Sequence, residues 1–284
     1  MSTKNKKQDE KKAMTAAEIR SMREEEMLDS VYREKTARER HTETVLVWAA
    51  AVLSTALIMT ALHFSHVFLT KMIAFVIPYL WMIPCNKLYL SDFLIKLTAL
   101  ILAVLLIILF DFALNINFST RARPKEKWKK IVKPVGLTAF GTVILYAVIA
   151  RVFGTGFTAP SGGVLSLIVY YLHKLLLVPV ADVLCYLVIP SAAVRMALMA
   201  IAETREKTEL PLLLSGWCVM AFCLLGLSWN GMVLAGAWVI LYQLMQSGAC
   251  SVLYHRTDTV WRPVMLYFGL TGTYFIVGWL LSLL

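Results

Sequence analysis

Seven ionisable residues interrupt the apolar stretches of this sequence: Lys71, Lys96, Asp111, Arg151, Lys174, Asp182 and Arg195. Charge is costly in hydrocarbon, so an ionisable side chain within a membrane span is a candidate functional site. Lys71 and Lys96 lie near the ends of their stretches, where a long side chain can carry its charge to the headgroups. The two aspartates and two arginines lie deeper. They predict internal ion pairs that fix helix packing, with the lining of a polar cavity as the alternative.

The histidines and cysteines do not form a recognisable metal motif. His63 and His66 are three residues apart and could share a helix face, but no third ligand follows nearby. The five cysteines lack the short paired spacing of a zinc site or a disulfide framework. The sequence therefore predicts no metal and no other cofactor, and the cysteines are interpreted as small hydrophobic residues.

The composition indicates a membrane protein. Hydrophobic residues make up 59% of the 284 residues and charged residues only 16%, and several apolar stretches are long enough to cross a bilayer. We therefore expect an all-α fold, a polytopic bundle of transmembrane helices. The net charge of +10 would suggest nucleic-acid binding in a soluble protein. In a membrane protein, basic cytoplasmic loops account for it, so no nucleic-acid partner is predicted.

The chain divides into three predicted parts. Residues 1–43 are polar, and the capping-box pattern Thr15-Ala16-Ala17-Glu18 predicts a cytoplasmic helix from about residue 15 to Thr42. Its closely mixed charges are typical of a solvated helix, with docking on a partner or on lipid headgroups as the alternative. Residues 44–157 are expected to hold the N-terminal transmembrane helices, and residues 158–284 to form the core of the bundle.

Charge and hydropathy together predict the topology. The basic residues cluster at 33–40, 121–133, 205–207 and 256–262, and the positive-inside rule places all four groups in the cytoplasm. Nine apolar stretches can be counted, at residues 44–62, 66–84, 93–118, 134–157, 162–178, 180–201, 210–229, 231–253 and 263–284.

The count of nine apolar stretches conflicts with the positive-inside rule, because two cytoplasmic loops must be separated by an even number of membrane crossings. Three stretches lie in each of the first two intervals between basic groups. One stretch in each three is then expected not to cross. The candidates are 66–84, which Lys71, Pro78 and Pro84 interrupt, and 162–201, which could be one long broken element. We predict seven to nine spans in the plasma membrane, with the N-terminus in the cytoplasm and the C-terminus outside.

The turn between the last two stretches carries the most specific motif. It contains Tyr254, Arg256, Thr257, Val260, Trp261 and Pro263. The pattern resembles the loop Tyr-x-Arg-Thr-Gly-Ser-aliphatic-Trp-x-Pro of the CAAX protease and bacteriocin-processing (CPBP, or Abi) family of intramembrane proteases. Asp258 and Thr259 stand where the family has Gly and Ser. The resemblance covers the C-terminal third of the chain and implies a CPBP-like core in residues 158–284.

The resemblance also implies catalytic positions, and all of them are substituted here. The family's Glu-Glu-x-x-x-Arg, His and His-x-x-x-Asn residues fall on Ala193, Val194, Leu198, Gly226, Tyr267 and Thr271. In the family, glutamates and histidines activate a water molecule for peptide hydrolysis, which requires titratable side chains. Glu203 and Glu206 lie about 15 Å further along a helix from Ala193, so they are not expected to replace the lost glutamates. No catalytic residue is predicted.

Three functions follow as hypotheses. The favoured one is a non-catalytic CPBP-like membrane protein that binds a partner protein or peptide through a remnant intramembrane cavity, besides membrane lipid. The second is an active intramembrane endopeptidase that uses unrecognised residues. The third is a small transporter or channel subunit that uses the ionisable residues within the spans.

The same turn predicts how the last helix is anchored. Trp261 and Arg262 suit the boundary between water and lipid, and Pro263 suits the first turn of a helix. We expect Tyr267 to lie one turn inside the membrane and to face Gly226.

Overall fold

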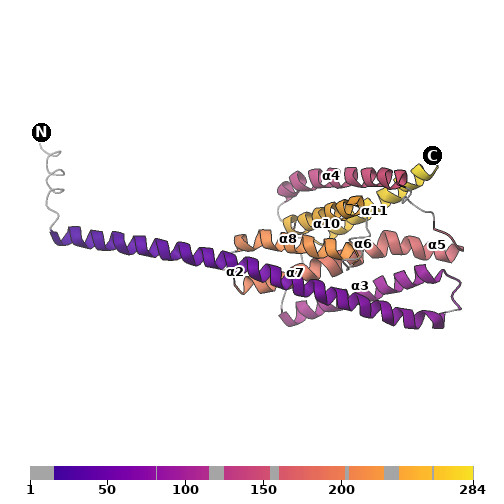
Figure 1. Ribbon diagram of the computed structural model, residues 1–284, viewed down its shortest axis with the longest axis horizontal. Coiled ribbons are helices and arrows are strands. Elements are labelled where there is room, and N and C mark those ends of the chain that lie inside the picture. The colour runs from indigo at the N-terminus through magenta and orange to yellow at the C-terminus, as the bar shows by residue number, and fades with distance from the viewer. Residues whose placement is uncertain are drawn as a thin grey trace.

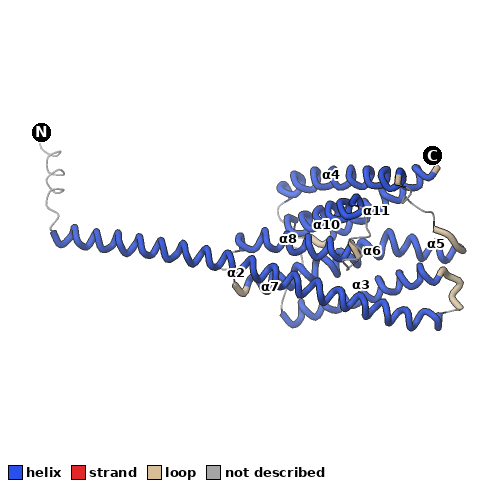
Figure 2. The backbone as a smooth tube through the Cα atoms, viewed as in Figure 1, coloured by secondary structure: helices blue, strands red, loops and turns tan. Residues whose placement is uncertain are grey.

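Helices make up almost all of the computed structural model, which describes residues 16–80, 82–114, 125–153, 160–201, 205–226, 237–257 and 259–283. No strand occurs in these ranges (Figure 2), so the all-α fold predicted from the sequence is confirmed. In chain order the elements are α2 (Ala16–Val76), η1 (Ile77–Leu80), α3 (Lys87–Leu114), α4 (Lys125–Val152), α5 (Val164–Tyr171), η2 (Leu172–Leu177), α6 (Val178–Val183), η3 (Leu184–Val188), α7 (Ile189–Met199), α8 (Arg205–Leu224), α10 (Ala237–Thr257) and α11 (Trp261–Ser282).

α2 is one uninterrupted helix of 61 residues. The prediction that the N-terminal helix ends near Thr42 is therefore wrong. Residues 66–76, which belong to the stretch given as a candidate for not crossing, continue the same helix. No proline or glycine stands between Ala16 and Val76, so nothing in this segment interrupts the backbone hydrogen bonds of the helix. The helix gives way to the 3₁₀ turn η1, whose second residue is Pro78. The segment from His41 to Leu80 is apolar enough to cross a membrane.

The stretch expected to form one long broken element does so. α5, η2, α6, η3 and α7 follow one another without a gap from Val164 to Met199. η2 and η3 are π-helical turns, and Pro179 and Pro190 each follow one of them by two residues. A proline lacks its N–H and pushes against the carbonyl four residues back, and a wider π turn at that point accommodates both effects.

This central run forms the core of the bundle. Its residues Val183 and Leu187 are fully buried and pack in one cluster with Val219 of α8, Leu253 of α10 and Leu270 of α11. The surrounding helices leave many large apolar side chains exposed, as expected for helices whose outer faces meet lipid.

Polar contacts define the two ends of the bundle. At one end, Lys207 of α8 pairs with Glu43 of α2, and Arg256 of α10 lies 3.9 Å from Glu209 of α8. The part of α2 that precedes this level extends beyond the bundle (Figure 1). At the opposite end, Arg151 Nε of α4 donates to the carbonyl of Leu281 in α11 (3.2 Å), and the backbone N–H of Asn86 donates to Ser166 Oγ (2.8 Å).

The helix directions remove the parity conflict found in the sequence. Two long helical elements, rather than three, separate the first and second basic groups, namely α2 and α3. Two also separate the second and third groups, namely α4 and the α5–α7 run. The starts of α4 and α8 and the turn between α10 and α11 thus lie at one end of the bundle (Figure 1). Within the described residues, six helical segments have the length and composition of membrane spans.

Candidate functional site

A buried ion pair lies at the middle of the central run. The Lys96 ammonium of α3 pairs with Asp182 Oδ1 of α6, and the hydroxyl of Tyr267 in α11 donates to Asp182 Oδ2 (3.0 Å). Lys96 Nζ also lies 3.4 Å from the Tyr186 hydroxyl and 4.9 Å from the centre of that ring. The side chain of Asp182 is only 4% exposed. The expectation that Lys96 extends to the headgroups is therefore wrong, because its charge is compensated inside the bundle.

This cluster links three helices of different parts of the chain. Asp182 accepts on both carboxylate oxygens, from an ammonium and from a phenol. A buried charge pair whose remaining hydrogen-bonding capacity is also satisfied holds its helices in one arrangement, and loss of one partner leaves an uncompensated charge. Its immediate role in the structure is thus to fix α3 and α11 against the central run.

The other ionisable residues do not join this cluster. Arg151 is at the end of α4 and is exposed, and Arg195 is half-buried on α7. Lys71 is exposed on α2 and Lys174 is half-buried in η2. The side chain of Asp111 lies outside the described residues.

His63 and His66 share a face of α2 without a third ligand. Both are half-buried. In the part of the chain that the structure describes, no group of three His, Cys, Asp or Glu side chains is placed to hold a metal ion.

The six substituted family positions do not converge. Val194 and Leu198 are fully buried in a small apolar cluster with Val47 and Ala51 of α2. Tyr267 belongs to the larger core cluster instead. The place that the resemblance assigns to a cavity is therefore filled by packed side chains.

The remaining positions lie apart from both clusters. Gly226 is exposed at the end of α8, where its φ of 91° suits glycine. The expectation that Tyr267 faces it is wrong, because the Tyr267 hydroxyl is bound to Asp182. Ala193 is half-buried, and Thr271 donates to the Tyr267 carbonyl (3.0 Å). The side chains of Glu203 and Glu206 lie outside the described residues.

Part of the motif packs in the α10–α11 turn, whereas its Arg256 and Trp261 are exposed. Thr257 is fully buried, donates to the Leu253 carbonyl and shares a hydrogen bond with Thr259 (3.0 Å). Tyr254 and Val260 pack against the core cluster. The motif thus connects α10 to α11 through buried contacts; Asp258 lies outside the described residues.

The start of α11 agrees with the prediction for its first turn. α11 begins at Trp261, with Pro263 as its third residue. Pro263 is buried, whereas Trp261 is 70% exposed. Proline costs no helix hydrogen bond at this place.

A pair of polar side chains that the sequence analysis did not identify connects α7 to α10. Ser191 Oγ and His255 Nε2 lie 3.3 Å apart and share a hydrogen bond, and Ser191 is 1% exposed. Gly216 of α8 lies against both, because a Cβ on it would meet each of these atoms at 3.1 Å. The two residues are 64 positions apart, and no local pattern indicates their contact.

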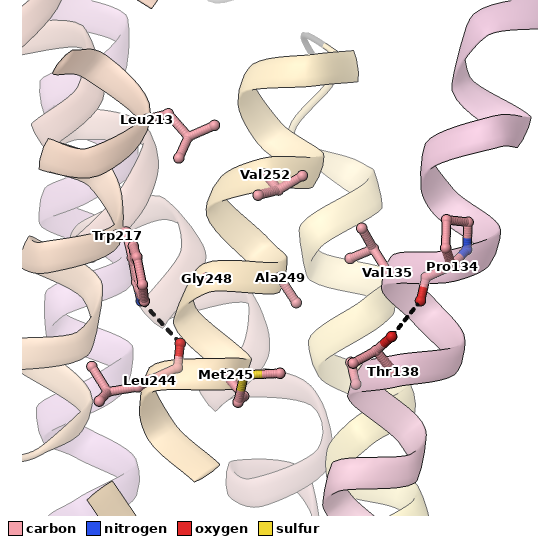
Figure 3. A pocket seen from close by; sticks show the side chains of 11 residues that line it. Pro134, Val135, Thr138, Leu213, Trp217, Leu244, Met245, Gly248, Ala249 and Val252 are labelled. Carbon is pink, nitrogen blue, oxygen red and sulfur yellow. Dashed lines mark hydrogen bonds between the residues drawn. The ribbon is translucent and has the colours of Figure 1, made fainter. Parts of the chain in front are cut away.

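An apolar pocket of about 390 Å³ opens between α4, α8 and α10 (Figure 3). We call it the α10 groove. Its lining comes from all three helices and consists of Pro134, Val135, Thr138, Ala139, Leu213, Trp217, Leu244, Met245, Gly248, Ala249 and Val252. None of the six substituted family positions is among them.

The polar atoms of the groove lining are already bound. Trp217 Nε1 donates to the Leu244 carbonyl (2.9 Å), and Thr138 Oγ1 donates to the Pro134 carbonyl (2.9 Å). The groove therefore offers an apolar surface to an occupant. An occupant that is itself apolar fits it without leaving any polar group unsatisfied.

Comparisons of this chain with protein families, curated proteins and solved structures found no match.

Proposed function

We propose that this chain is a non-catalytic, CPBP-like integral membrane protein that binds a partner protein or peptide within the membrane. The observation that carries the proposal is the α10 groove. It is a preformed apolar site at the depth of the spans, and each polar side chain in its lining is already hydrogen-bonded. The groove takes the place of the remnant cavity expected at the substituted family positions.

The chemistry of the described residues favours binding over catalysis. Val194 and Leu198 cannot activate water and are packed against α2. Asp182 is the buried carboxylate nearest to a family position, and its two oxygens are bound by Lys96 and Tyr267. A carboxylate held in this way is not available as a general base.

The proposal includes a topology. Seven long helical elements, α2, α3, α4, the α5–α7 run, α8, α10 and α11, cross the plasma membrane, with the four basic groups in the cytoplasm. The N-terminus is then cytoplasmic and the C-terminus is outside. Support comes from the helix directions, which bring the basic ends of α4, α8 and α10 to one side of the bundle.

Cysteine labelling tests the topology. With exposed Cys218 replaced by serine, Arg256→Cys should react with a membrane-impermeant maleimide only after permeabilisation of the cells. Ser161→Cys, at the other end of the bundle, should react on intact cells. The reverse pattern would contradict the orientation.

Partner binding is tested by filling the groove. Full-length protein is purified from its own membranes in mild detergent and compared with Met245→Trp, which places an indole in the groove, and with Ile276→Trp on the exposed face of α11. We expect a protein that co-purifies with the wild type and with Ile276→Trp, and is lost from Met245→Trp. Identical protein profiles for all three would reject the proposal.

A small transporter is the second candidate, because Asp182 lies in a helix interrupted by π turns on both sides. Such turns are frequent at functional sites, and buried charges in spans line many ion pathways. Measuring the flux of protons or solutes in proteoliposomes tests whether the protein is a transporter. Transport that stops in the double variant Asp182→Asn with Lys96→Met, which removes both buried charges, would favour this function, and equal flux with and without the protein would reject it.

A further inference from the structure

The shape of the α10 groove suits a helix. Its walls contribute residues four apart, Pro134 and Thr138 from α4, and Leu213 and Trp217 from α8. Residues at this spacing follow one face of a helix, so both walls run parallel to the helix axes over about one turn. A groove that runs parallel to the neighbouring helices can accept another helix packed against them at a small crossing angle.

The floor of the groove is low at its centre. Gly248 and Ala249 of α10 lie between the larger Met245 and Val252 (Figure 3). Trp217 covers one side of Gly248, since a Cβ there would lie 3.3 Å from Trp217 Nε1, and the bond to Leu244 holds this indole in place. The indole occupies the space that a Cβ of Gly248 would fill, so Ala249 is the small floor residue over which the backbone of a second helix could approach closely, as helices do when they associate in membranes. An acyl chain has no need of such a floor.

The rim of the groove carries charge. One turn beyond the lining, toward the end of the basic groups, the same helix faces hold Lys130 of α4, Glu209 of α8 and Arg256 of α10. Lys130 is exposed, and Arg256 lies 3.9 Å from Glu209 with its side chain half exposed. A pair at this distance and exposure is weak. Among the described side chains one turn beyond the lining, the two cations outnumber the one anion, which favours an acidic side chain on the occupant.

From this arrangement we infer that the α10 groove binds one transmembrane helix of a partner protein, with an acidic residue at the membrane boundary beside Lys130 and Arg256. The inference rests on the proposed function and names the class of partner. The apolar face of the partner helix lies over Gly248 and Ala249, and the acidic side chain fixes its direction and depth.

The test is photo-crosslinking in native membranes with the full-length protein. Benzoyl-phenylalanine replaces Leu241, which is exposed on α10 one turn from Met245 at the edge of the groove, or the exposed Thr138 on the α4 wall, and Ile276 on the exposed face of α11 serves as the control. We expect a protein adduct from the two groove positions only. The crosslinked peptide should be an apolar segment long enough to span the membrane, with Asp or Glu next to its end on the side of the basic groups.

Charge reversal tests the rim. Lys130→Glu together with Arg256→Glu should lower the yield of the protein adduct about threefold to tenfold, the size expected for two partly exposed ion pairs. Lys133 is exposed on a neighbouring face of α4, so the control variant Lys133→Glu should leave the yield of the protein adduct unchanged.

The possible outcomes separate this inference from the proposed function. A protein adduct whose peptide lacks the acidic residue, or that resists the double charge reversal, overturns the inference and leaves partner binding intact. An adduct with lipid alone from positions 241 and 138, or no protein adduct from either, overturns both.

Discussion

Asp182 is the residue on which the polar interior of the bundle depends. Asp182→Asn leaves the Lys96 ammonium without its counter-charge in a buried site, and we expect a loss of about 3–5 kcal/mol of stability. The double variant Asp182→Asn with Lys96→Met removes both charges and should recover a large part of the loss. The midpoint of thermal unfolding in detergent measures both effects.

The control for this prediction is Asp92→Asn, because Asp92 lies on the exposed side of α3. It should leave the midpoint unchanged. Equal destabilisation by the single and the double variant would show that Lys96 is stable without Asp182, and that the pair does not hold the helices together.

Gly216 is the second residue with a defined steric role. A methyl group at this position would lie 3.1 Å from Ser191 Oγ, His255 Nε2 and Leu187 Cδ1, in a place where α7, α8 and α10 meet. We expect Gly216→Ala to destabilise the protein by about 1–3 kcal/mol, as overpacking does in other cores. Adding Ser191→Ala to the Gly216→Ala variant should recover part of the lost stability. Gly141→Ala, with no atom within 4 Å of its Cβ, is the matched control.

Among the elements, α11 is the one that we predict to be held by residues at the membrane boundary. Trp261 is 70% exposed and is followed by Arg262 and the buried Pro263. Replacing Trp261 and Arg262 by alanine removes the aromatic ring and the cation that suit the headgroup region. We expect α11 to shift, and a cysteine in place of exposed Met265 to react about fivefold faster with an impermeant reagent. This corresponds to ~1 kcal/mol for a basic residue at an anionic surface.

Trp279→Ala provides the comparison, because Trp279 is exposed near the other end of α11. It should not change the reactivity of Met265→Cys. An unchanged rate in the double variant would mean that the buried contacts of Pro263 and the core, rather than the boundary residues, set the depth of this helix.

The elements also show which features a sequence can reveal. The broken run at residues 162–201 was predictable because proline and charge interrupt it without a polar loop, and Pro263 marked the first turn of α11. Hydropathy does not reveal the continuity of α2, because charged residues give way to apolar ones near Thr44 without any break in the helix. The absence of proline and glycine from this segment was the better guide to the backbone.

Tertiary pairing was beyond the reach of the sequence. Lys96 and Asp182 are 86 positions apart, and Ser191 and His255 are 64 apart. Each residue could be identified as unusual in an apolar stretch, but the choice of partner depends on which helix faces meet. The α10 groove likewise arises from three helices, and no single stretch carries a pattern for it.

For the molecule as a whole, we predict no peptidase activity. Purified protein should not cleave prenylated or leader peptides, with or without added zinc, because the described residues provide no metal-binding group and the family positions provide no base. Ser191 and His255 resemble a nucleophile and its base, yet Ser191 is only 1% exposed. Cleavage assays by mass spectrometry check this, and turnover that Ser191→Ala or Asp182→Asn abolishes would contradict it.

The uninterrupted α2 gives the molecule a mechanical property. A helix of 61 residues is about 90 Å long, and about 38 Å of it precedes His41. Val47 and Ala51 then pack against Val194 of α7, and Glu43 pairs with Lys207. No proline or glycine interrupts α2 between these contacts and its outer end, so a displacement of the projecting part would be passed along one continuous helix to the contacts of Val47 and Ala51 with α7.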